Sequence, residues 1–171
     1  MSTINIFIIE DNAVFRMALK ADIELTFPNK PIAIHSFETG ESCMEKFKEI
    51  KPEVVILDYH LNSRNPEAAD GIRMLDLFKS ENSQSNVIIL TSDDDLEIAL
   101  KSFHHGAYDY VVKSETKFKK INYSLFNLFS MMEAKKETNK YKYMVAVLFA
   151  CVSLLVGVLV ASQVSWFTFL K

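Results

Sequence analysis

The chain has 171 residues, 49% of them hydrophobic and 24% charged, and its formal net charge is −3 at pH 7. This length allows one globular domain with a core of its own and one further segment. The mild acidic balance does not suggest a nucleic-acid-binding surface, so we expect no nucleic-acid partner. Cys43 and Cys151 are the two cysteines. One lies in a predicted helix and the other in an apolar segment near the C-terminus, so we expect no disulfide.

Short apolar runs alternate with amphipathic segments of helical length over the first two thirds of the chain. This alternation is typical of buried parallel strands that are connected by helices. The predicted strands cover residues 4–9, 32–35, 53–57, 86–90 and 108–112. A helix is predicted after each strand, and Ser114 is a suitable N-cap for the fifth.

The first predicted helix runs from Asn12 to about Thr26, where the Phe27-Pro28 pair ends it. Either Asn12 or one of the two preceding acids can cap its first turn. We expect an apolar stripe at helical spacing to face the sheet. The residues of this stripe are Val14, Met17, Ala18, Ala21 and Leu25.

Five strands that alternate with five helices predict a doubly wound α/β fold, with the flavodoxin-like strand order 2-1-3-4-5. The carboxyl ends of parallel strands meet at one edge of the sheet. Four of the predicted strands end on polar residues, which are Glu10-Asp11, Asp58, Thr91 and Lys113. Strands one and three are neighbours, roughly 4.8 Å apart, in this order. Asp11 and Asp58 are therefore expected to lie close enough to share one cation.

This group of side chains suits the transfer of a phosphoryl group onto an aspartate. A carboxylate that attacks phosphorus is repelled by the charge of the phosphoryl oxygens, so the reaction needs a hard cation with oxygen ligands. Phosphoryl transfer needs little beyond positioning and charge neutralisation. Mg²⁺ and Lys113 would supply the positive charge, and Thr91 could donate a hydrogen bond to a phosphoryl oxygen.

The same residues, in this order and at these strand ends, resemble the receiver domain of two-component response regulators over about residues 3–130. The resemblance implies that Asp58 is the phosphoacceptor and that Lys113 contacts the phosphoryl group. It implies a Mg²⁺ site made by Glu10, Asp11, Asp58 and the backbone carbonyl of His60. It also implies that Thr91 and Tyr110 form a switch pair. Apart from phosphotransfer to itself and autodephosphorylation, no enzymatic activity is expected.

Two features depart from the usual pattern of this family. Ser114 follows Lys113 where the family usually has proline, so we expect no cis peptide bond there. The loop after Asp58 is also longer than usual, over Asn62–Asp70. This length bears on access to the site and on the choice of partner.

Other polar residues have ordinary structural explanations. Asp93, Asp94 and Asp95 look like a metal-binding cluster, but a helix cap in a solvated loop explains them better. His104 and His105 end a predicted helix, where they interact favourably with its dipole, and His35 is expected to be structural. Tyr110 could equally be a permanently packed core aromatic.

The C-terminal segment has a different composition. No charged residue occurs from Tyr143 to Leu170, and a helix of this length exceeds the ~30 Å hydrocarbon core of a bilayer. We therefore predict a receiver domain over residues 1–130, a basic juxtamembrane linker over 131–142 and a transmembrane helix over 143–170. Four lysines precede the apolar stretch and only Lys171 follows it. This asymmetry predicts a single-pass protein of the cell inner membrane, with the receiver in the cytoplasm.

Two properties of this segment remain open at the level of sequence. Small residues recur every fourth position, which suits a homodimer through the transmembrane helix or simply reflects the composition of spanning helices. These are Ser153, Gly157, Ala161 and Ser165. The fifth helix either ends with the receiver or continues through 133–142 into the apolar segment.

The sequence therefore predicts a membrane-anchored single-domain response regulator. It would receive phosphate from a histidine kinase or phosphotransfer protein and signal to an unknown downstream protein by direct contact. The alternative is a pseudo-receiver that is not phosphorylated and acts as a membrane-tethered scaffold. A phosphohydrolase with an aspartyl nucleophile fits less well, because the chain has Glu10-Asp11 after the first strand in place of the D-x-D pattern of the haloacid dehalogenase-like enzymes.

Overall fold

The computed structural model describes residues 3–61, 70–92 and 94–169. Most of the predicted long loop, residues 62–69, lies outside the described residues, as does Asp93. The described residues fall into two compact units, one up to Ser124 and the other from Leu125 onward. All five strands lie in the first unit.

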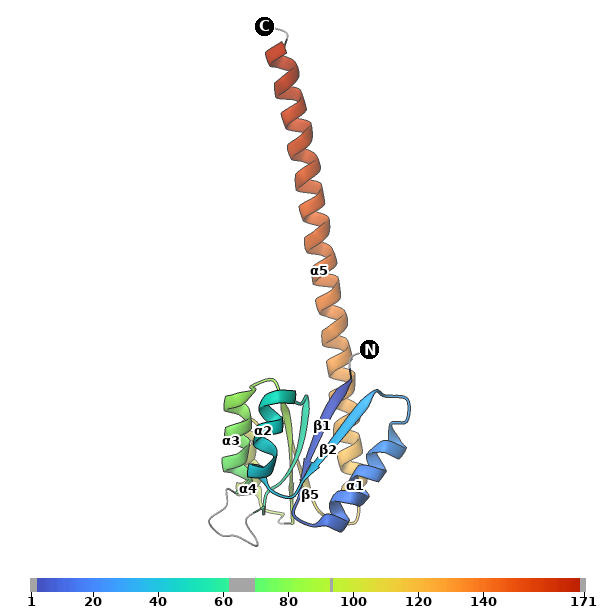
Figure 1. Ribbon diagram of the computed structural model, residues 1–171, viewed down its shortest axis with the longest axis vertical. Helices are drawn as coiled ribbons and strands as arrows, with labels where there is room; N and C mark the ends of the chain where they lie inside the picture. The colour runs from blue at the N-terminus through green and yellow to red at the C-terminus, as the bar shows by residue number, and fades with distance from the viewer. Residues whose placement is uncertain (1–2, 62–69, 93, 170–171) are drawn as a thin grey trace. The chain divides into compact units, whose positions relative to one another are not determined.

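A five-stranded parallel sheet forms the centre of the first unit, and its strand order is β2-β1-β3-β4-β5, as predicted (Figure 1). The strands are β1 (Ile4–Ile9), β2 (Ile32–Phe37), β3 (Val54–Asp58), β4 (Asn86–Thr91) and β5 (Asp109–Val112). All four neighbouring pairs are parallel. Such pairs need crossover connections, and helices provide them.

Helices cover both faces of this sheet, with α2 and α3 on one face and α1 on the other (Figure 1). The helices are α1 (Ala13–Thr26), α2 (Gly40–Ile50), α3 (Gly71–Glu81), α4 (Leu96–His104) and α5 (Lys117–Phe169). Polar side chains cap the first four helices at their N-termini. The N-caps are Asn12, Thr39, Asp70 and Asp95.

The three central strands, β1, β3 and β4, are mostly buried because their side chains pack on both faces of the sheet. Every residue of β3 is buried, as are the last four residues of β1 and the last five of β4. Aromatic rings fill the layer beneath α2 and α3, where Phe47 stacks on Phe78 with ring centroids 4.6 Å apart. A close-packed core of this kind fixes the strand ends, and therefore the side chains that follow them.

The orientation predicted for α1 is wrong. Val14, Met17 and Leu25, which were expected to face the sheet, are 78%, 72% and 81% exposed. Leu19 and Ile23 are fully buried instead. Helix α1 carries a second apolar stripe on another side, which contains Leu19 and Ile23, and this is the stripe that the core covers.

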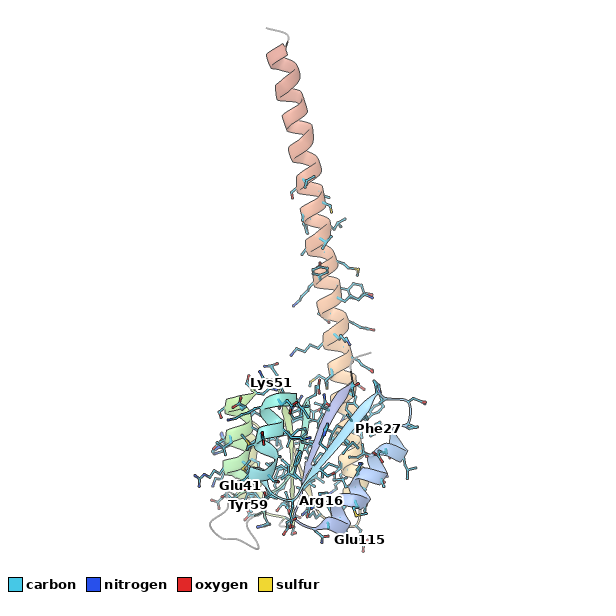
Figure 2. The ribbon with its side chains drawn as sticks, viewed as in Figure 1. Arg16, Phe27, Glu41, Lys51, Tyr59 and Glu115 are labelled. Atoms are coloured by element: carbon cyan, nitrogen blue, oxygen red, sulfur yellow. The ribbon has the colours of Figure 1, made fainter. Side chains whose placement is uncertain are left out.

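The turn after β3 depends on a glycine. The backbone N–H of Gly71 donates to the carbonyl of Tyr59 at 3.0 Å, and a Cβ atom at Gly71 would lie 2.6 Å from the Cα of Tyr59. Tyr59, labelled in Figure 2, comes directly after Asp58 in the chain. Because the start of α3 presses on this turn, any side chain at Gly71 would displace the backbone beside Asp58.

Helix α5 is continuous from Lys117 to Phe169, so the predicted linker over 131–142 is helical. Of the two alternatives for the fifth helix, the structure shows the one in which it continues beyond the receiver domain. Within the first unit, α5 is tied to α1 by Asn122, whose side-chain amide donates to Asp22 at 2.7 Å and to Thr26 at 3.1 Å. Across the described residues, no helix is both long and apolar enough to cross a membrane. The expected transmembrane helix over 143–170 is therefore not supported.

The reversed orientation of α1 can be tested with two leucines of the same helix. Leu19→Ala should lower the free energy of unfolding by about 2–5 kcal/mol, because it leaves a cavity in the core. Leu25→Ala should change it by less than about 0.5 kcal/mol, because Leu25 is exposed. Urea unfolding followed by circular dichroism measures both values. Equal losses for the two variants would contradict this orientation.

Candidate phosphoryl-transfer site

Three carboxylates converge at the carboxyl edge of the sheet. The register pairs Ile9 of β1 with Leu57 of β3, so the residues that follow them, Glu10 and Asp58, are neighbours. Oxygen atoms of Glu10, Asp11 and Asp58 all lie within 4.8 Å of one another. Glu10 is 1% exposed and Asp58 is 3% exposed. The predicted acidic site is therefore formed, and two of its members are almost wholly removed from water.

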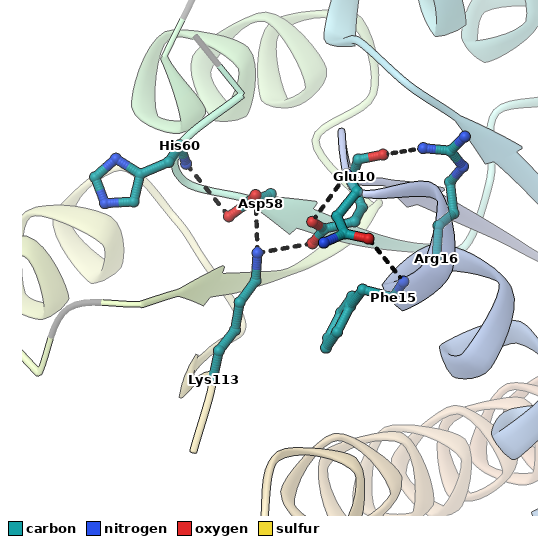
Figure 3. A network of polar contacts seen from close by, with 7 residues as sticks. Glu10, Phe15, Arg16, Asp58, His60 and Lys113 are labelled. Atoms are coloured by element: carbon teal, nitrogen blue, oxygen red, sulfur yellow. Dashed lines mark hydrogen bonds and ion pairs between the residues drawn. The ribbon is translucent and has the colours of Figure 1, made fainter. Parts of the chain in front are cut away.

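The ammonium of Lys113 lies between two of these carboxylates. Its Nζ is 2.8 Å from Oε2 of Glu10 and 2.8 Å from Oδ2 of Asp58 (Figure 3). The backbone N–H of Lys113 donates to the carbonyl of Thr91 at 2.6 Å, which joins the ends of β4 and β5. No cis peptide bond occurs in the described residues, so the expectation for Lys113-Ser114 is confirmed.

Burial and charge change the pKa values of this pair. Burial raises the pKa of Glu10 above its usual value, repulsion from Asp58 raises it further, and the contact with Lys113 only partly compensates. Burial alone would lower the pKa of Lys113, but the hydrogen bond and charge of Asp58, and then those of Glu10, raise it overall. Lys113 therefore stays protonated at neutral pH. A further positive charge nearby would stabilise the ionised form of Glu10.

The donor set fits a hard divalent cation. All three acidic residues offer oxygen atoms, which Mg²⁺ prefers, and one ammonium cannot neutralise three carboxylates. Oε2 of Glu10 is buried, and among the described residues the ion pair with Lys113 is the contact that the structure gives it. A buried carboxylate oxygen left in this state is a ready ligand. The backbone N–H of His60 donates to Oδ1 of Asp58 at 3.3 Å, while the role of the His60 carbonyl stays a prediction.

The two residues of the expected switch pair are both near the end of the sheet but differ in their surroundings. Thr91 ends β4 and is fully buried. Tyr110 is half-buried against the core, and its hydroxyl donates to the carbonyl of Asp95 at 3.4 Å. Tyr110 thus connects β5 to the start of α4.

Three residues of α1 or its cap belong to the site and were missed in the sequence. The backbone N–H of Asn12 donates to Oε1 of Glu10 at 3.3 Å. Arg16 donates from Nη1 to the carbonyl of Glu10, and its side chain is labelled in Figures 2 and 3. The ring of Phe15 lies under the ammonium of Lys113, 5.2 Å from it. The sequence offered one signal for these three residues, which is that they follow Asp11 within five positions of the chain.

Two polar residues that were expected to have structural roles, Asp95 and His105, make local contacts at the two ends of α4. Asp95 caps α4, since its Oδ1 accepts from the N–H of Glu97 at 2.8 Å. At the other end of α4, Nδ1 of His105 lies 2.7 Å from Oδ1 of Asp76. Cys43 is buried, with its pKa raised to about 12, chiefly by that burial. These groups take no part in the acidic site.

A family model described as "Response regulator receiver domain" matches residues 6–122. The chain is 32% identical over 114 residues to the regulatory protein AtoC of Escherichia coli, a match that covers 66% of this chain and 23% of AtoC. It is 29% identical over 108 residues to the chemotaxis protein CheY of Bacillus subtilis, covering 63% of this chain and 83% of CheY.

Solved structures agree on the fold. A receiver domain protein from Clostridium thermocellum superposes with a TM-score of 0.65 at 20% identity, over 77% of this chain and 98% of that one. The chain thus spans nearly all of a separate receiver domain, but less than a quarter of the length of AtoC.

The electrostatics of Glu10 predict how Mg²⁺ binding depends on pH. A protonated Glu10 is not a ligand, and its pKa is raised, so affinity should fall as the pH is lowered, beginning above the range usual for glutamate. Below the pKa of Glu10 the fall should be about tenfold per pH unit for one displaced proton. Titration calorimetry between pH 8 and pH 5 measures it. Glu10→Gln should bind Mg²⁺ more weakly, and its affinity should no longer fall in this pH range. If the affinity of Glu10→Gln depends on pH as that of the wild type does, Glu10 is not the source of the pH dependence.

Proposed function

The chain belongs to the family of response regulator receiver domains, and on that premise we propose that it accepts a phosphoryl group on Asp58 from a histidine kinase or phosphotransfer protein. The observation that carries the proposal is the contact of Lys113 with both Asp58 and Glu10, each at 2.8 Å. A buried carboxylate that faces an ammonium and two further acids is suited to attack a phosphoryl group whose charge must be neutralised.

The proposed reaction assigns a task to each side chain. A carboxylate oxygen of Asp58 forms a bond to phosphorus as the bond from phosphorus to the donor breaks, and the donor keeps the electron pair. Glu10 and Asp11, with Asp58, would hold Mg²⁺, which neutralises charge on the phosphoryl oxygens when bound. Lys113 would pair with a phosphoryl oxygen that comes within its reach. Water would later hydrolyse the acyl phosphate.

The phosphoacceptor can be identified with a small phosphodonor. With Mg²⁺ and acetyl phosphate, the full chain should gain the mass of one phosphoryl group, and Asp58→Asn should gain none, because an amide cannot form the acyl phosphate. Asp94→Asn, at an exposed aspartate, is the matched control and should be labelled like the wild type. Equal labelling of Asp58→Asn would refute the assignment. A wild-type chain that stays unlabelled would favour the unphosphorylated scaffold.

We further propose that Thr91 and Tyr110 convey phosphorylation to α4. Thr91 ends β4 and follows Leu90, the register partner of Asp58, so its hydroxyl can reach toward a phosphoryl group on Asp58. Such a move would leave space for the ring of Tyr110, whose hydroxyl contacts the Asp95 carbonyl at the cap of α4. The surface of α4 and β5 would then change, and a downstream protein would bind that surface.

For the C-terminal segment we propose a membrane anchor, on the grounds of its sequence. The uncharged stretch from Tyr143 to Leu170 is long enough to span a bilayer. In the described part of this stretch, large apolar side chains such as Phe149 and Leu154 are 71% and 68% exposed, a costly state in water. The lysines at 135, 136, 140 and 142 favour a cytoplasmic receiver.

Membrane extraction tests the anchor. The full chain should remain with the membrane pellet after high salt and after alkaline carbonate, because salt screens charge attraction but not apolar insertion. A chain truncated before Lys140 should be recovered in the supernatant and should still accept phosphate, since the site residues precede Ser114. Recovery of the full chain in the supernatant would rule out the anchor.

A further inference from the structure

Lys113 contacts an aromatic ring as well as two carboxylates. Its Nζ lies over the ring of Phe15, 5.2 Å from the centroid, and 2.8 Å from an oxygen of each acid (Figure 3). The face of an aromatic ring carries partial negative charge and attracts an ammonium within about 6 Å. The Lys113 side chain is 16% exposed, and removal from water strengthens this attraction.

The ring itself is held in place by two helices. Phe15 is in the first turn of α1, where its backbone N–H donates to Oδ1 of the cap Asn12 at 3.1 Å. Its ring packs against Phe118 at the start of α5, with centroids 5.5 Å apart and planes inclined by 44°. The ammonium of Lys117 also lies over both rings, at 5.8 Å and 5.7 Å. The ring is therefore a fixed platform.

We propose that Phe15 is a positioning residue for phosphoryl transfer, because its ring holds the Lys113 ammonium beside Asp58 throughout the reaction. This inference rests on the proposed function. In that reaction both acids that contact Lys113 have other tasks, Glu10 as a metal ligand and Asp58 as the nucleophile. Neither can hold the lysine at all stages. Phe15 has no second task and keeps its contact when the acids turn away.

The flexibility of lysine makes such a platform necessary. The ammonium sits at the end of a four-carbon stem, which samples many rotamers when nothing restrains it. Phosphoryl transfer depends on charges that are already in place when the transition state forms. Without the ring, Lys113 would spend part of its time away from Asp58. Losing the free energy of a partly buried cation–π contact corresponds to a transfer rate that is roughly 2- to 30-fold lower.

Substitutions that separate the charge of the ring from its volume test this inference in the full chain. Phe15→Leu should slow phosphorylation by acetyl phosphate at saturating Mg²⁺ about 2- to 30-fold, and Phe15→Tyr should restore a rate near that of the wild type. Fluorinated phenylalanines at position 15 keep the shape of the ring but weaken its negative face. The rate should therefore fall stepwise with each added fluorine. A flat fluorine series would overturn the proposal.

A second measurement needs no phosphodonor. The ε-methylene protons of Lys113 should show an upfield NMR shift from the ring of Phe15, and this shift should disappear in Phe15→Leu. If it disappears while the phosphorylation rate is unchanged, Phe15 has no positioning role and the proposal is wrong. A wild-type chain that takes up no phosphate would overturn the proposed function itself, which distinguishes the two failures.

Discussion

The contact of Lys113 with Glu10 and Asp58 is the interaction on which the rest of the site depends. Two acids that are almost wholly buried are held side by side, and such a pair is costly unless a positive charge lies between them. Among Glu10, Asp11, Asp58 and Lys113, three carboxylates and one ammonium leave a formal charge of −2 (−3 + 1). This imbalance makes the site suited to a divalent cation. Burial is the larger cause of the raised pKa of Glu10, and the charge of Asp58 adds to it.

The parallel sheet makes this arrangement possible, and that part could be predicted from the sequence. Strand ends are visible as apolar runs that stop at Asp58 or Lys113, and in a parallel sheet all carboxyl ends share one edge. The strand order then follows from crossover rules and the usual order of such sheets. The register is a finding of the structure, and pairs such as Ile9 with Leu57 place the acids next to one another. The residues could be named because the chemistry depends on backbone topology, which a sequence pattern encodes well.

The contacts between helices could not be predicted in the same way. Helix α1 has one apolar stripe with Val14 and Leu25 and another with Leu19 and Ile23, and periodicity alone cannot say which one the sheet covers. Phe15 was overlooked for the same reason, since its position under Lys113 depends on how the start of α1 meets the start of α5. Side chains that are about 100 positions apart in the chain, such as Asp22 and Asn122, fix that geometry.

The central claim is that Asp58 receives the phosphoryl group, and borohydride trapping tests it most directly. Reduction of an aspartyl phosphate converts that one residue to homoserine, which peptide sequencing by mass spectrometry locates in the wild-type chain. After treatment with Mg²⁺ and acetyl phosphate, we expect homoserine at position 58. Homoserine at another aspartate, such as Asp11 or Asp94, or no homoserine in a chain that has gained phosphate, would contradict this account.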